Sequence, residues 1–132
     1  MEWQTAKRIR VMIVDTDWTL GIKLADWLAA HGYQPVLHRS YDAALNEVNS
    51  IRPEAIIIAV DSCCLPEQAD VSQLLFRLQT ICPDLPVIGI ADTITESVAL
   101  FGDHSDVQLL VKPVDFVEVE RLLRSGQYLA TV

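Results

Sequence analysis

The sequence predicts an α/β domain built on an open, parallel sheet that helices cover on both faces. Five strand-length apolar segments alternate along the 132 residues with five longer segments whose apolar residues recur at helical spacing. Residues 55–60 are apolar throughout, which is typical of a parallel strand buried on both of its faces. Strands and helices that alternate in this way are joined by crossover connections and form a single parallel sheet.

The expected strands are short runs rich in β-branched residues. The first, at residues 10–14, ends just before Asp15. The second, at 34–38, contains Pro35, which cannot donate a backbone hydrogen bond and therefore indicates an edge strand. The remaining strands are expected at 55–60, 86–91 and 107–111.

The expected helices follow these strands. The first carries Leu20, Leu24 and Leu28 at helical spacing and ends at Gly32. Residues 61–70, with Pro66, are expected to form a loop. The other helices are expected at 42–49, 71–81, 95–101 and 116–123. The chain is thus one domain, 1–132, with a core at about 8–124 and a C-terminal tail at 125–132.

Charge and composition exclude several functions. The formal net charge of −8 and the pI near 4.6 would repel nucleic acid, so direct DNA or RNA binding is not expected. No apolar segment has the length of a membrane span, and no targeting segment is recognised. Three cysteines, an odd number, predict a reducing, cytoplasmic compartment. The adjacent Cys63 and Cys64 lack further ligands at zinc spacing.

Residues at the carboxyl ends of the expected strands are the candidate site, because open parallel sheets bind ligands there. These residues are Asp15, Thr16 and Asp17, then Ala59 to Asp61, Ala91 to Thr93, and Lys112. The sequence has no glycine-rich phosphate loop and no hydrolytic nucleophile elbow, and its histidines have no metal spacing. A nucleotide-binding, dehydrogenase or hydrolase function is therefore not expected.

Three motifs, in order, carry a resemblance to a known family. They are Val14-Asp15-Thr16-Asp17 after the first strand, Gly32-Tyr33 after the first helix, and Lys112-Pro113 after the fifth strand. With these motifs, residues 10–124 resemble the receiver domain of response regulators, in the CheY-like superfamily. The resemblance implies a flavodoxin-like (βα)5 sandwich with five parallel strands in the order 2-1-3-4-5, and a part in two-component signalling or a phosphorelay.

Receivers accept a phosphoryl group from a histidine kinase on an aspartate that ends the third strand. Acidic residues after the first strand hold Mg²⁺, a lysine neutralises the phosphoryl oxygens, and a Ser or Thr and an aromatic residue form the switch. Asp15 and Lys112 match this pattern, whereas the second acidic position is Thr16. Lys112 either coordinates phosphate or pairs with Asp15 or Asp61. The peptide bond between Lys112 and Pro113 is either cis or trans, and the sequence does not decide between them.

The phosphoacceptor position holds Ala59. No gap is needed in counting from Gly32 to Pro53, so the third strand aligns with that of receivers in a fixed register. Alanine has no nucleophilic atom, so phosphorylation at Ala59 is chemically impossible. The Ser/Thr switch position is Ala91 and the aromatic switch position is Leu109.

Asp61 is the alternative acceptor. It lies two residues beyond Ala59 and would face the same way if the strand continued. Mg²⁺, if bound, would then be held by Asp15, Asp17 and Asp61. The other interpretation is that Asp61 is a turn acid of the following loop, and in that case no metal is expected.

These observations favour a pseudo-receiver, a non-enzymatic module without a cofactor that acts independently of phosphorylation. Its expected partner is a signalling protein, a kinase or an output domain. A second copy could bind through the fourth helix, fifth strand and fifth helix, at Leu109, Phe116, Val117 and Glu120. The alternative hypothesis is a working receiver that needs Mg²⁺ and is phosphorylated on Asp61. A remote third hypothesis is a flavodoxin-like enzyme or ligand-binding protein.

Overall fold

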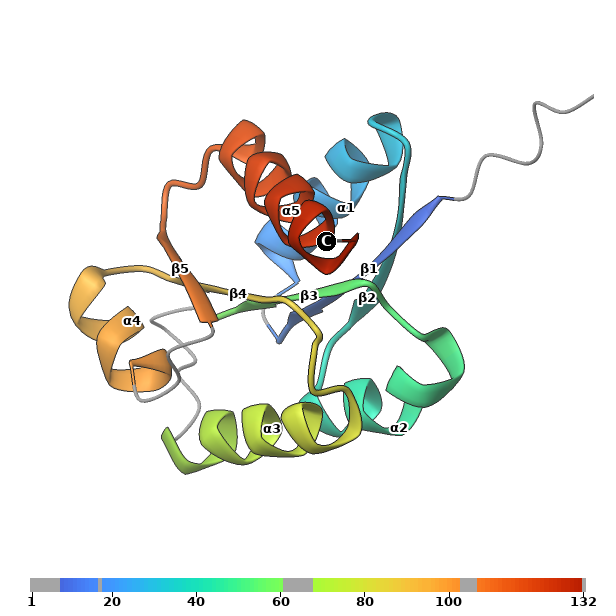
Figure 1. Ribbon diagram of the computed structural model, residues 1–132. Coiled ribbons are helices and arrows are strands. Elements are labelled where there is room, and N and C mark those ends of the chain that lie inside the picture. Colours follow the sequence, from blue (N-terminus) through green and yellow to red (C-terminus); the bar gives the residue numbers. More distant parts are fainter. Residues whose placement is uncertain (1–7, 17, 61–67, 103–106, 132) are drawn as a thin grey trace, which may run out of the picture.

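The computed structural model describes residues 8–16, 18–60, 68–102 and 107–131, in which strands and helices alternate (Figure 1). The strands are β1 (Ile9–Asp15), β2 (Tyr33–His38), β3 (Ala55–Ala59), β4 (Val87–Ala91) and β5 (Val107–Val111). The helices are α1 (Thr19–Ala30), α2 (Tyr41–Ile51), α3 (Gln68–Ile81), α4 (Ile94–Phe101) and α5 (Phe116–Thr131). Each strand and helix expected from the sequence is present.

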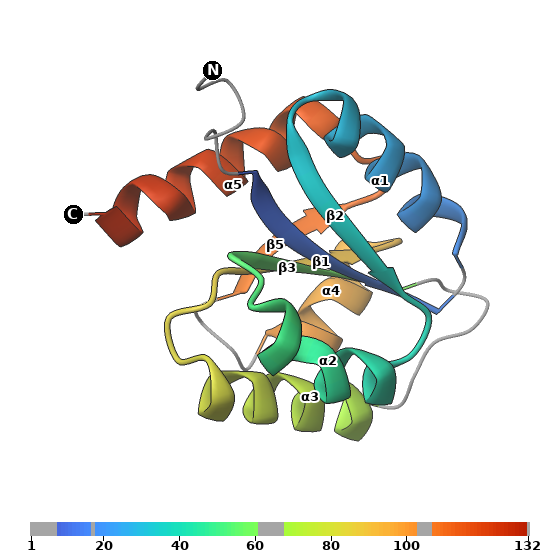
Figure 2. The same ribbon diagram turned by 90° about the vertical axis from the view of Figure 1, so that its right-hand side faces the viewer.

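The five strands form one parallel sheet in the order β2-β1-β3-β4-β5. Helices α1 and α5 cover one face, and α2, α3 and α4 cover the other (Figures 1 and 2). The predicted flavodoxin-like fold and strand order are therefore confirmed. The strand with Pro35 is β2, which lies at the edge of the sheet as expected.

Strand β3 is the centre of the core, and every one of its residues is at most 2% exposed. Ile56 and Ile58 belong to the apolar cluster beneath α2, α3 and α4. Ile57 and Ala59 belong to the cluster beneath α1 and α5. Because successive side chains of a strand point to opposite faces, a strand covered on both faces must be apolar throughout. This requirement explains the uninterrupted apolar run.

Two helix boundaries differ from the expected ones by three residues or more. Helix α5 continues to Thr131, eight residues beyond the expected end at Leu123, so residues 125–131 are helical. The division between a core at 8–124 and a C-terminal tail stays a prediction. Gly126 costs a helix about 1 kcal/mol, but no proline follows it to end the helix. Helix α3 begins at Gln68, three residues before the expected start at Val71. No helix within the described ranges is long and apolar enough to cross a membrane.

Helix α4 docks on β4 through the side chain of Phe101, which is fully buried. A Cβ atom added at Gly89 of β4 would lie 2.9 Å from atoms of the Phe101 ring, closer than packed atoms approach. The missing side chain at Gly89 therefore provides the space that the ring occupies. The position of α4 over the sheet depends on this close contact.

Helix α5 is held against its neighbours by aromatic and polar contacts. The rings of Trp27 and Phe116 meet edge to face, with centroids 5.9 Å apart, and connect α1 to α5. The Tyr33 hydroxyl of β2 donates a long hydrogen bond of 3.5 Å to Glu120, which also accepts one from Arg124. Burial of the ring and the Glu120 carboxylate both raise the pKa of Tyr33.

Candidate functional site

The carboxyl ends of β1, β3, β4 and β5 meet at one edge of the sheet. The parallel register places Asp15 of β1 beside Ala59 of β3, and Ala59 beside Ile90 of β4. Ala91, the last residue of β4, pairs with Val111, and the carbonyl of Ala91 accepts a hydrogen bond from the Lys112 amide. The structure thus brings together the predicted site residues of these four strands.

Ala59 ends β3 at the centre of this edge. Its side chain is 2% exposed and packs in the apolar cluster beneath α1 and α5. Its neighbour on β1, Asp15, is also 2% exposed. The position nearest to the buried acid is therefore occupied by a methyl group, which cannot carry a phosphoryl group.

Asp15 caps the first helix. Its Oδ2 atom accepts a hydrogen bond of 2.7 Å from the backbone amide of Gly21, in the first turn of α1. The residue at the N-cap position, Trp18, adopts a left-handed conformation and offers no side-chain acceptor. A carboxylate that accepts helix N-terminal amides satisfies donors that would otherwise be unpaired and interacts favourably with the helix dipole.

Gly21 makes this capping contact possible. A Cβ atom at this position would lie 2.8 Å from Cδ1 of Leu37 and 3.1 Å from Oδ2 of Asp15. Any larger residue would push α1 away from β1 and β2 and would lengthen the capping hydrogen bond. Gly21 was not predicted as a site residue, although a glycine six residues after the acid, within an amphipathic helix, is a signal for this role.

The other acidic candidates are not in the described structure. Asp17 and Asp61 lie outside the described residues, and the side chain of Thr16 is exposed. Within the described ranges, no group of three or more His, Cys, Asp or Glu side chains is arranged to hold a metal ion. The role of Asp61 as acceptor or turn acid therefore stays a prediction.

Lys112 forms an ion pair with Asp92. Its Nζ atom lies 2.9 Å from Oδ1 of Asp92, and both side chains are about one-quarter exposed. Asp92, which follows the last residue of β4, was not predicted as a partner, and the expected alternatives, Asp15 and Asp61, stay predictions. Asp92 comes one residue after β4, the strand next to β5, and this position indicates that its side chain can reach Lys112. The peptide bond between Lys112 and Pro113 is cis.

Both switch positions hold apolar residues, and the nearest hydroxyl group caps a helix. Ala91 is fully buried. Thr93, the nearest hydroxyl in the sequence, is the N-cap of α4, and its Oγ1 accepts a hydrogen bond of 3.1 Å from the amide of Glu96. Thr93 therefore begins α4. Leu109 points outward from β5 and is 41% exposed.

Two residues expected on the outer face of α5 lie elsewhere. Phe116 contacts Trp27 of α1, and Glu120 contacts Tyr33 of β2 and Arg124. Both therefore help to dock α5 on the domain and do not belong to a surface shared with α4 and β5. Val117, in contrast, is 64% exposed, as expected.

Solved receiver domains share this fold. The signal receiver domain of an HD domain-containing protein from Pseudomonas fluorescens Pf-5 has a TM-score of 0.75 and 22% identity, covering 92% of this chain and 96% of that chain. FixJ-N has a TM-score of 0.72 and 20% identity, covering 92% of this chain and 94% of that chain. The response regulator TrrA from Thermotoga maritima, solved with Mg²⁺ and BeF, has a TM-score of 0.73 and 17% identity, covering 89% of this chain and 98% of that chain. These likenesses establish the fold of response-regulator receivers.

Comparisons of sequence alone are less informative. No protein-family model matches the chain. Anthranilate synthase component II from Haloarcula marismortui is 26% identical over 94 residues, which are 71% of this chain. The chain matches 44% of the length of that protein. A similarity of this extent assigns no activity.

Replacing Asp15 with alanine should lower the free energy of unfolding by about 1–2 kcal/mol, because the buried amide of Gly21 loses its acceptor. Urea denaturation measures this loss. The matched control is Thr16→Ala at the exposed neighbouring position, which should change stability by less than about 0.5 kcal/mol. Equal effects of the two substitutions would contradict the capping role.

The ion pair between Asp92 and Lys112 should contribute up to about 1 kcal/mol, because both groups are partly exposed. A double-mutant cycle with Asp92→Asn and Lys112→Met measures this coupling by urea denaturation. We expect the double variant to be more stable than the sum of the two single losses implies. Strictly additive losses would show that the pair does not stabilise the fold.

Proposed function

We propose that this chain is a pseudo-receiver, a module that binds a protein partner in a two-component-type signalling system without being phosphorylated. The observation that carries the proposal is Ala59, which lies buried beside Asp15 at the end of β3. In this proposal the domain is not an enzyme, requires neither Mg²⁺ nor another cofactor, and works in the cytoplasm.

The retained charged residues support this proposal, because each has a structural role. Asp15 caps α1, and Lys112 pairs with Asp92. In a working receiver the equivalent acid and lysine act on a metal and a phosphoryl group. Here the same residue types stabilise the ends of a helix and of two strands. Their retention is thus explained without phosphoryl transfer.

The ion pair also connects α4 to the strand-end site, the group of residues at the carboxyl ends of β1, β3, β4 and β5. Asp92 lies between the end of β4 and Thr93, the N-cap of α4. Lys112 follows β5, so the pair ties the start of α4 to the neighbouring strand. We infer that this tie fixes α4 and β5 relative to each other without a phosphoryl group.

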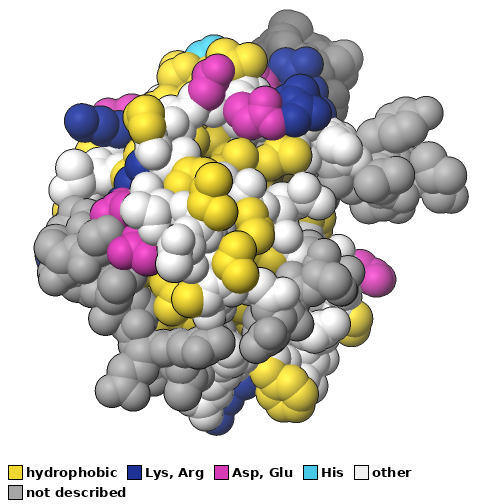
Figure 3. Space-filling view, turned by 90° about the vertical axis from the view of Figure 1, so that its left-hand side faces the viewer, with side chains coloured by type: hydrophobic (Ala, Val, Ile, Leu, Met, Phe, Trp, Pro, Cys, Tyr) yellow, Lys and Arg dark blue, Asp and Glu magenta, His cyan; other side chains and the backbone are white. Residues whose placement is uncertain are grey.

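The proposed interaction surface lies on α4, β5 and α5, and we call it the α4–β5–α5 face. Four large apolar side chains are exposed on it, by 41–70%: Ile94, Val98, Leu109 and Val117. Figure 3 shows hydrophobic side chains gathered on this side of the molecule. Apolar groups that gather on one side of a small soluble domain are typical of a protein-binding surface.

A second copy of the chain is the partner that we propose for this face. A twofold interface places the same patch of both copies in contact, so an apolar face is complementary to itself.

Incubation with acetyl phosphate and Mg²⁺ should leave the intact mass of this protein unchanged, because Ala59 offers no nucleophile. A phosphorylatable receiver treated in parallel serves as the positive control. Addition of one phosphoryl group would overturn the proposal. If the addition disappeared in Asp61→Asn, the alternative of a working receiver with a displaced acceptor would replace it.

The substitution Val98→Glu should abolish self-association, because it places a charge in the apolar centre of the interface. Sedimentation velocity over a range of protein concentrations measures the effect. The control is Phe76→Glu, at an apolar side chain of α3 that is 67% exposed and lies outside the face; it should leave the dimer intact. A wild-type protein that stays monomeric at all concentrations would refute the second copy as partner.

A further inference from the structure

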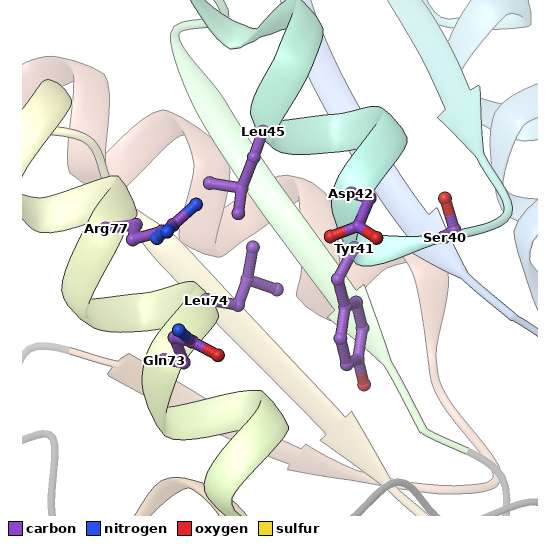
Figure 4. Close-up of a pocket in the computed structure, with 7 residues that line it drawn as sticks. All are labelled: Ser40, Tyr41, Asp42, Leu45, Gln73, Leu74 and Arg77. Carbon is purple, nitrogen blue, oxygen red and sulfur yellow. The ribbon is translucent and has the colours of Figure 1, made fainter.

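A cavity lies between α2 and α3 and has no part in the proposed function (Figure 4). Its volume is about 400 Å³, within the range of small-molecule pockets. The residues that line it come from the start of α2 and from α3: Ser40, Tyr41, Asp42, Leu45, Gln73, Leu74 and Arg77. No residue of the strand-end site is among them.

Part of the cavity surface is apolar. Leu74 of α3 is 1% exposed, and Leu45 of α2 is half-buried and packs against the same core cluster. The ring of Tyr41 extends along one side (Figure 4). An apolar group placed here would be removed from water by contacts on several sides.

Opposite charges lie on the two helices that border the cavity. Asp42 comes from α2, and Arg77 and Gln73 come from α3. Within the described residues, none of these three side chains forms a hydrogen bond or an ion pair with another part of the chain. Ser40, in contrast, already caps α2, since its Oγ accepts a hydrogen bond of 3.0 Å from the amide of Ala43.

The combination of charges restricts the ligand. A simple anion would be attracted by Arg77 and repelled by Asp42, and a simple cation would meet the opposite conditions. A ligand with one anionic and one cationic group satisfies both side chains, and the guanidinium is suited to a carboxylate because of its planar, forked geometry. The apolar part of the surface favours an apolar group beside the charged groups.

We propose that this cavity binds a small zwitterion, an amino acid or dipeptide with an apolar side chain. Its carboxylate binds Arg77 and Gln73, and its ammonium group binds Asp42. The apolar side chain rests on Leu45 and on the ring of Tyr41. An amino acid and a dipeptide share this chemistry and differ in the separation of their charges, so both are tested.

Titration of the wild-type protein with L-leucine and with L-leucyl-L-leucine, followed by two-dimensional amide NMR, tests the proposal. At least one of them should shift amide resonances confined to residues 40–45 and 73–77, at concentrations below about 10 mM. N-acetyl-L-leucine lacks the ammonium group and L-leucinamide lacks the carboxylate, so each should bind about tenfold more weakly. The absence of shifts with both zwitterions, or equal binding of the charge-deleted analogues, would overturn the proposal.

Two charge-removing variants locate the binding site. Arg77→Met should weaken zwitterion binding about tenfold, whereas Lys23→Met, which removes an exposed positive charge from α1, should have no effect. Asp42→Asn should abolish the preference for L-leucine over N-acetyl-L-leucine, and Asp26→Asn on α1 should preserve it. Unchanged binding in both Arg77→Met and Asp42→Asn would place any bound zwitterion outside this cavity and refute the assignment.

Discussion

The burial of β3 on both faces is the constraint on which the rest of the structure depends. The strand lies between β1 and β4, with helices above and below it, so its side chains contact no bulk water from start to end. A carboxylate at its last position would be desolvated and would need a cation to stay charged. Ala59 has no such need, and it allows the apolar core to extend to the edge of the sheet.

Once the central position is apolar, the charged residues around it are compensated locally. Asp15 contacts the N-terminus of α1, and Lys112 contacts the carboxylate of Asp92. Thr93 uses its hydroxyl oxygen to cap α4. A residue can therefore be retained in a family position for the helix or strand that it stabilises, and its presence alone does not indicate the chemistry of the family.

The strands were predictable because each has a local apolar pattern, and their order was implied by the resemblance to receivers. The end of α5 was not predictable, because the continuation of the helix past Gly126 is decided by small energy differences along the chain. The pairing of Lys112 with Asp92 depends on the register of two strands, which no local pattern shows. Phe116 and Glu120 were misplaced because the rotation of α5 about its axis is set by packing on α1 and β2.

The shortness of α4 has a consequence for how its surface could be used. This helix has eight residues, and its buried side includes Ser97, whose hydroxyl has no hydrogen-bond partner within the described residues. Short helices have little stability of their own, so α4 depends on the docking of Leu100 and Phe101. Local unfolding of such an element costs less than global unfolding. A partner on Ile94 and Val98 would therefore protect the backbone amides of α4 from hydrogen exchange, including those it does not touch.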